Sequence, residues 1–137
     1  MFNLFALWRD ADDRLDMAAL KDDFETRFAF AGDYTITTKD LVFPRVTILV
    51  LTQGDWEVQV WLWKGEDMTL DPTAVAEALP AGTVLPPDFA DYDTQIVLGF
   101  GDDPERLHTN DIIFLGEFVR ETYPGVVIFD QYNVDLW

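Results

Sequence analysis

The side chains of this sequence that could do chemistry are mainly carboxylates. The chain holds 26 Asp and Glu residues, against nine Lys and Arg, a single His and neither Cys nor Ser. Without Ser or Cys the commonest nucleophiles are missing, and neither a Ser-His-Asp nor a Cys-His set can be built. The one histidine, His108, is expected in a surface loop just before a helix. We therefore predict no catalytic residues and no enzyme activity.

Two groups of acidic residues stand close together in the sequence. They are Asp88, Asp91 and Asp93, and then Asp102, Asp103 and Glu105. Neither group has the spacing of a calcium loop, D-x-[DN]-x-[DN]-G closed by a Glu, and a zinc site would need further His or Cys residues. Paired carboxylates also serve glycosidases, but nothing in the sequence selects two of the 26. We expect no bound metal and no cofactor.

The charge of the chain is strongly negative and unevenly distributed. Residues 1–64 carry a net charge of −4 and residues 65–137 carry −13, with no Lys or Arg between Lys64 and Arg106. Nucleic acids and anionic membranes are bound through Lys and Arg, so we expect neither as a partner. A basic protein partner is favoured instead, although acidic charge can also serve only to keep an aromatic-rich protein soluble.

In size and charge the chain is similar to bacterial immunity proteins and to nuclease-inhibiting or DNA-mimicking proteins. The similarity is one of composition, and no functional residue follows from it. It implies an inhibitor that neutralises a basic protein, such as a toxin or nuclease, by occupying its active surface. Two alternatives stay open: a structural or oligomeric domain whose charge serves solubility only, and an uncharacterised enzyme that uses carboxylates.

Both acidic groups are candidate contacts for such a basic partner. We favour the group in the loop Pro80–Asp93, because its three prolines reduce the entropy that is lost on docking. The second group follows a predicted strand, Thr94–Phe100, so the two groups are expected at opposite ends of that strand. A seven-residue strand is roughly 20 Å long, and a protein interface could include one group or both.

Length and composition indicate one globular domain that spans residues 1–137. The chain is 49% hydrophobic and 15% aromatic, which supports a hydrophobic core. The absence of Cys fits a reducing compartment, and the first residues lack the layout of a signal peptide. No apolar run approaches the ~20 residues that cross a bilayer. We expect a cytoplasmic protein, with an oligomeric state that the sequence leaves open.

The stretch that should organise the fold is Val46–Lys64. Two β-prone runs flank Gln53-Gly54-Asp55, a pattern that predicts a β-hairpin, and the apolar first arm places this hairpin at the centre of a sheet. Alternation puts Val58 and Val60 on one face. Trp61 and Trp63 point to the other face, where either a helix of the same domain covers them or they form a binding patch.

The rest of the chain predicts strands and helices in the order β-α-β-β-β-α-β-α-β, an α+β fold with a mixed, mainly antiparallel sheet and about three helices. The further strands are predicted at Phe2–Trp8, Tyr34–Thr38, Thr94–Phe100 and Val126–Phe129. The helices are predicted from about Asp13 to Gly32, from Pro72 to Leu79 and from Asn110 to Tyr123.

Several details of these elements can be predicted from local signals. Asp12 or Asp13 should cap the first helix, Asp71 the second, and Thr109 or Asn110 the third. The loop Pro80–Asp93 should be ordered, and the tail Asp130–Trp137 should dock on the body. The strand–helix–strand unit at 94–129 is a candidate for a right-handed parallel crossover.

Overall fold

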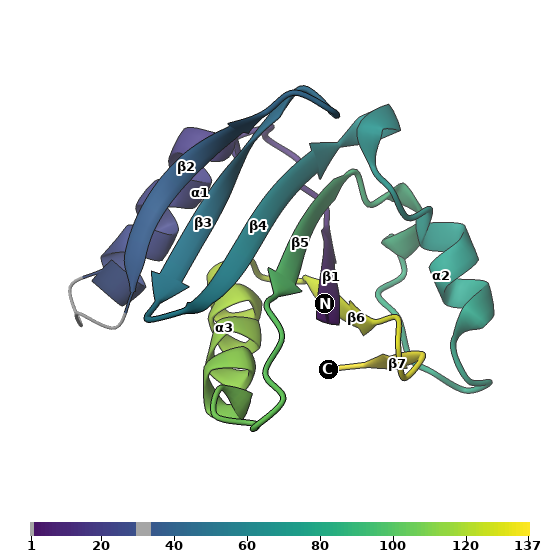
Figure 1. Cartoon of the computed structure of the whole chain (residues 1–137). Coiled ribbons are helices and arrows are strands. Elements are labelled where there is room, and N and C mark those ends of the chain that lie inside the picture. Colours follow the sequence, from purple (N-terminus) through teal and green to yellow (C-terminus); the bar gives the residue numbers. More distant parts are fainter. Residues whose placement is uncertain (1, 30–33) are drawn as a thin grey trace.

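The computed structural model describes residues 2–29 and 34–137, which form an antiparallel sheet with helices on both faces (Figure 1). The described strands are β1 (Phe2–Trp8), β2 (Thr35–Leu41), β3 (Val46–Gln53), β4 (Trp56–Lys64), β5 (Thr94–Phe100), β6 (Val127–Asp130) and β7 (Asp135–Leu136). They lie in the order β2-β3-β4-β5-β1-β6-β7. The α+β fold and the predicted order of elements are confirmed, and the structure adds the short strand β7.

The described helices are α1 (Met17–Phe24), which a π-helical turn continues over Glu25–Ala29, α2 (Pro72–Ala78) and α3 (Thr109–Thr122). Two short 3-10 segments, Gly65–Asp67 and Phe89–Asp91, lie in the connections on either side of α2. The predicted stripe of α1 is confirmed, because Leu20, Phe24 and Phe28 are buried. Gly32, expected to end this helix, lies outside the described residues.

The N-caps agree with the prediction in one helix out of three. The carboxylate of Asp71 accepts a hydrogen bond from the N–H of Thr73, and Pro72 opens α2 as expected. Helix α1 is capped by Asp16, whose carboxylate accepts from Ala19, so the prediction of Asp12 or Asp13 was wrong. Asp13 instead sits in a turn with a positive φ of 49°.

The cap of α3 was also predicted wrongly. The N-cap position is His108, and its side chain makes no capping hydrogen bond. The carboxylate of Asp103 instead closes the preceding loop, since it accepts from the N–H groups of Leu107 and His108 at 2.8 and 2.7 Å. Thr109 and Asn110 are therefore already inside the helix.

The two faces of the sheet hold separate hydrophobic clusters. Val58 and Val60 are fully buried on the face that α1 and α3 cover, where Phe24 and Leu115 pack, which confirms the predicted face of β4. The opposite face carries a smaller cluster with α2 and the following loop. Trp61 and Trp63 stack on each other at 5.8 Å and lie half-buried against this second cluster.

The centre of the sheet is β5 rather than the predicted hairpin. Every residue of β5 is buried, and its neighbours are β4 on one side and β1 on the other. Because β1 is antiparallel to both β5 and β6, these two strands run in the same direction with β1 between them. The connection through α3 therefore joins two parallel strands, β5 and β6, as predicted. These strands are not direct neighbours, because β1 lies between them. The first strand of the chain fills a position that local sequence could not indicate.

The loop Pro80–Asp93 and the C-terminal tail are both ordered. Phe89 and Tyr92 are buried and hold the loop against the sheet. The Trp137 ring lies against Gly116 of α3, and its Nε1 donates to Asp130, so this end of the tail docks as predicted, whereas Tyr132 is 85% exposed. In the described part of the chain, none of the helices is both long and apolar enough to span a membrane.

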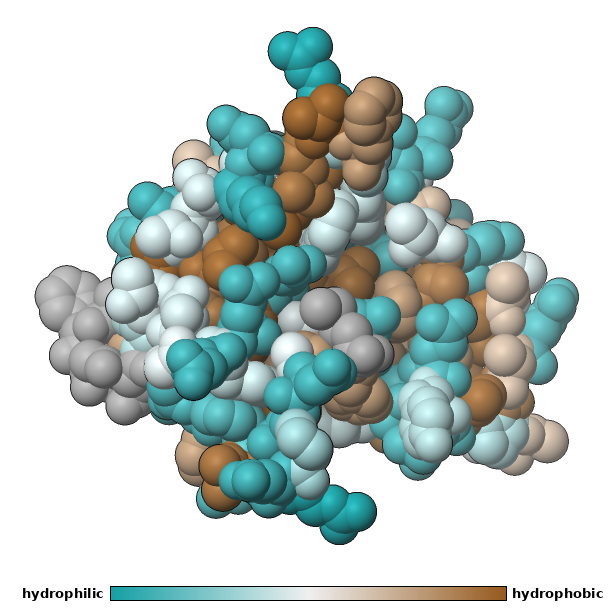
Figure 2. Space-filling view, viewed as in Figure 1, coloured by the Kyte–Doolittle hydropathy of each residue, from teal (hydrophilic) through white to brown (hydrophobic). Residues whose placement is uncertain are grey.

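The turn of the β2–β3 hairpin exposes large apolar side chains. This turn, residues 42–45, contains a cis peptide bond before Pro44. Val42 is 71% and Phe43 94% exposed there, and Figure 2 shows the apolar surface that this tip presents.

Candidate functional site

The structure places the two acidic groups at opposite ends of β5, as expected. The first group lies in the loop that leads into the strand. Asp88 pairs with the guanidinium of Arg9 at 3.4 Å. Asp93, although exposed, accepts hydrogen bonds from the backbone N–H of Asp10 at 3.1 Å and from the hydroxyl of Thr94 at 3.0 Å. Asp91 is exposed at the end of its 3-10 turn. Two of the three carboxylates thus already have partners within the fold.

A network of ion pairs lies beside this loop group. The Lys64 ammonium donates to Asp10 at 2.9 Å and to Asp13 at 2.6 Å, and the side chain of Asp10 is only 4% exposed. Burial works against the charge of Asp10, but hydrogen bonds from Lys64 and from the N–H groups of Leu15 and Arg14 outweigh it and hold its pKa below the ordinary value.

Burial likewise works against the charge of Lys64, and the two carboxylates outweigh it, so the pKa of Lys64 is raised. Arg9, which comes from earlier in the chain than the loop group, pairs with Asp88, so one carboxylate of a segment without any basic residue is neutralised by a distant residue. This end of the sheet is acidic in composition, and its charges are partly compensated by Arg9 and Lys64.

The second acidic group lies in the loop after β5, residues 101–108, and has a different environment. Asp103 accepts two backbone hydrogen bonds within this loop, and Asp102 and Glu105 are exposed. The β3–β4 turn brings Asp55 to the same place, because β4 pairs antiparallel with β5 and therefore begins where β5 ends. Gly54 permits this tight turn with a φ of +59°.

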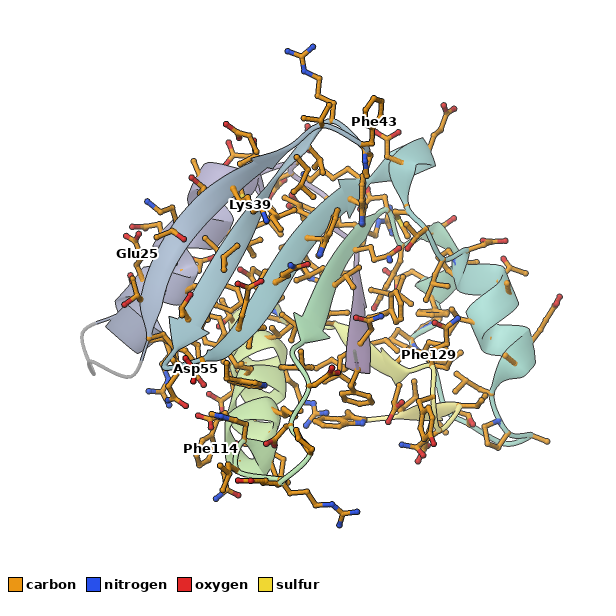
Figure 3. All side chains as sticks on the ribbon, in the orientation of Figure 1. Glu25, Lys39, Phe43, Asp55, Phe114 and Phe129 are labelled. Atoms are coloured by element: carbon orange, nitrogen blue, oxygen red, sulfur yellow. The ribbon has the colours of Figure 1, made fainter. Side chains whose placement is uncertain are left out.

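These residues line a surface hollow of about 590 Å³ together with Leu107, Trp56 and His108. We call Asp55, Asp102, Asp103, Glu105 and Leu107 the turn surface. Leu107 is 71% exposed, and Phe114 in the second turn of α3 is 57% exposed. Figure 3 shows Asp55 and Phe114 at the same end of the molecule. The turn surface thus combines carboxylates with the exposed apolar side chain of Leu107.

His108 supports the loop of the turn surface. Its ring stacks on Trp56 with the centroids 4.1 Å apart and the planes 5° from parallel, and Nδ1 lies 3.1 Å from a carboxylate oxygen of Asp111. The hydroxyl of Tyr34 donates to the other oxygen of Asp111 at 2.8 Å. His108 was predicted as a surface loop residue. It does lie in the loop before α3, but its side chain is only 18% exposed, because the ring packs on Trp56.

The backbone of the same loop is held in a costly conformation. Arg106 has a φ of 56°, a left-handed value that costs a non-glycine residue about 1 kcal/mol or more. Asp103 holds this turn closed, because its carbonyl accepts from the N–H of Arg106 and its carboxylate accepts from the two following N–H groups. The loop is therefore preorganised rather than free to collapse onto the body.

Sequence reasoning named Asp102, Asp103 and Glu105 of the turn surface but missed Asp55 and Leu107. The Gln53-Gly54-Asp55 turn was recognised, yet its position beside the loop 101–108 depends on the pairing of β4 with β5, which only the fold supplies. Among the residues that the structure describes, no group of three or more His, Asp or Glu side chains is arranged to hold a metal ion.

Comparison of the chain with protein-family models, with curated proteins and with solved structures found no match.

Proposed function

We propose that this protein is an inhibitor that binds a basic protein through the turn surface and neutralises it by occupying its active surface. The observation that carries the proposal is the combination of Asp55, Asp102 and Glu105, which come from two separate segments, around the exposed Leu107. An apolar anchor with charged groups at its rim is the usual composition of a protein interface.

The turn surface is a better candidate than the loop group that the sequence favoured. Arg9 pairs with Asp88, and two hydrogen bonds within the fold engage Asp93, so a partner would have to compete with these contacts. On the turn surface, Asp55 and Glu105 are exposed. The loop 101–108 contains one basic residue, Arg106. Long-range attraction by a net charge of −17 would accelerate association with any basic partner, and the turn surface would give it a place to dock.

The proposal is tested with two triple variants that change the net charge equally. In one, Asp55, Asp102 and Glu105 become Asn, Asn and Gln; in the other, Asp88, Asp91 and Asp93 become Asn. The probe is the protein encoded beside this chain, because a toxin inhibitor normally lies next to its toxin. Circular dichroism and thermal melting show whether each variant keeps the fold.

Association rates are then measured by stopped flow at low and high NaCl. We expect the turn-surface variant to associate about tenfold more slowly and with a flatter salt dependence, and the loop variant to stay close to the parent. Leu107→Ala should mainly increase the dissociation rate, because it removes the apolar anchor. If the neighbouring protein does not bind, or if both triple variants associate as fast as the parent, the proposal is wrong.

A further inference from the structure

We propose that two copies of this chain pair edge to edge through β2, antiparallel across a two-fold axis, so that their sheets become one continuous sheet. This inference is independent of the proposed function. It starts from the position of β2, which is the terminal strand of the described sheet and has β3 as its neighbour there. Figure 1 shows β2 along the outer margin of the sheet, with α1 behind it.

The β2 edge is long and has few of the features that protect sheet edges. Its seven residues span roughly 20 Å, and they include no Pro or Gly. Natural proteins usually close such an edge with Pro, a bulge, several Lys residues or a very short strand. β2 carries a single lysine, Lys39. The other edge of the described sheet, β7, is by contrast very short, with only two residues.

The composition of β2 favours pairing with another strand. Thr35, Ile36, Thr37 and Thr38 are β-branched residues, which suit a pleated surface, and the three threonines are exposed. The strand runs directly into the tip of the β2–β3 hairpin, where Phe43 is 94% exposed (Figure 3). A partner strand along β2 would pair with the exposed backbone edge of the strand.

The charge distribution selects a second copy of this chain as the occupant. Residues 34–54 contain Lys39 and Arg45 but only one acid, Asp40, so this hairpin is slightly positive within a chain of −17. A basic protein would find no attraction at this hairpin. Two copies of an acidic protein repel each other everywhere, and they do so least where their surfaces carry little negative charge.

Geometry then restricts how two copies can meet. Two identical antiparallel edges are related by a two-fold axis perpendicular to the sheet, and residues directly opposite each other lie on the same face. Side chains alternate between the two faces along a strand. Two residues that stand opposite each other must therefore both have odd residue numbers or both have even ones. The axis consequently passes beside a residue. Thr38, the middle residue of β2, allows the longest pairing, and an axis beside Thr37 gives a shorter one. Because each copy offers one long edge, the assembly closes as a dimer.

The absence of Cys from the chain permits a clean cross-linking test. Thr37→Cys and Thr38→Cys are compared with Thr73→Cys, an exposed position on α2, under mild oxidation. We expect one of the two β2 variants to form a disulfide-linked dimer at least tenfold faster than the α2 variant, because residues at the axis face their own copies. Equal rates for all three variants would overturn the proposal.

Sedimentation of the unmodified chain gives a second, independent readout. Raising NaCl screens the repulsion between two copies, so the dimer should become tighter as salt rises, whereas binding to a basic partner should become weaker. Thr38→Glu should reduce the dimer constant by tenfold or more, and the charge-matched control Thr73→Glu should change it little.

The outcomes separate this inference from the proposed function. The turn-surface variant should keep the dimer, and Thr38→Glu should keep the association rate with the basic partner. A chain that stays monomeric at ~100 μM in high salt, or a dimer that Thr38→Glu leaves intact, would show that β2 is not the interface.

Discussion

Replacing Lys64 by Met should destabilise the fold in a way that depends on pH. The substitution keeps most of the aliphatic side chain but removes the ammonium group that Asp10 and Asp13 share. The carboxylate of Asp10, whose side chain is 4% exposed, then retains only its backbone donors, among them the N–H of Leu15 at 2.6 Å. Its charge stays buried with less compensation.

The expected cost is set by the bond to Asp10. A hydrogen bond between charged groups contributes about 1.5–3 kcal/mol, and breaking a fully buried ion pair costs about 3–5 kcal/mol. The Lys64 side chain is 31% exposed, so water partly screens the pair and the lower range applies. The bond to Asp13 adds little, because that carboxylate is 87% exposed. We expect a loss of about 2 kcal/mol in the free energy of unfolding at neutral pH, or roughly 6–8 °C in melting temperature.

The pH dependence follows from the directions of the two pKa shifts. The pKa of Asp10 lies below its ordinary value of 3.8, so its contribution to stability is present above that pH and disappears as the pH falls through the folded-state pKa. The pKa of Lys64 lies above 10.5, so its contribution is present below that pH and disappears as the pH rises through the folded-state pKa. The effect of the substitution should be largest between these limits.

The assay is urea unfolding of the parent and of Lys64→Met at about pH 7 and about pH 3. Lys21→Met is the matched control, because it removes the same charge from an exposed pair with Glu25 at 3.1 Å and should cost only about 0.3–0.5 kcal/mol. If both variants lose the same stability, or if the Lys64 variant loses as much at the acidic pH as at the neutral one, the reasoning about the buried pair is refuted.

Two further substitutions test the core and the tail. Val58→Asp should prevent folding, because it places an unpaired charge on a fully buried position at a cost of several kcal/mol; a well-expressed variant with unchanged melting would contradict this face assignment. Gly116→Leu should destabilise the fold by about 1–3 kcal/mol, because even a Cβ at this position would lie 3.2 Å from the ring of Trp137; the measurement is thermal melting, with no effect expected once Trp137 is replaced by Ala.

The parts of the fold that follow from local patterns could be predicted from the sequence. Alternation in the hairpin assigned Val58 and Val60 to the buried face, and the Asp71-Pro72 signal marked the start of α2. The cap of α1 could not be chosen in the same way, because Asp12, Asp13 and Asp16 all have suitable side chains. Lys64, 51 residues away from Asp13, holds that carboxylate outside the helix. Such a choice depends on a tertiary contact.

The candidate site was predictable to a similar extent. The charge imbalance and the two acidic groups at the ends of one strand could be read directly. Which of the two groups is the better candidate for binding a partner could not be predicted. Arg9 neutralises Asp88 from a distant segment, and the β3–β4 turn brings Asp55 beside Glu105. Both effects depend on strand order, which long-range packing determines and local periodicity does not encode.

The position of β1 between β5 and β6 has a consequence for the order in which the chain folds. Phe2 pairs with Phe100 and Leu7 with Val127, so the first strand to be synthesised can only be completed by the last quarter of the chain. Until β5 is synthesised, β2, β3 and β4 can form their local hairpins, while the apolar residues of β1 have no neighbouring strand to pair with. Closing such long loops is entropically costly and slows folding. During synthesis, β1 therefore stays unpaired for longer than the other strands, and it is the segment that most needs protection from aggregation.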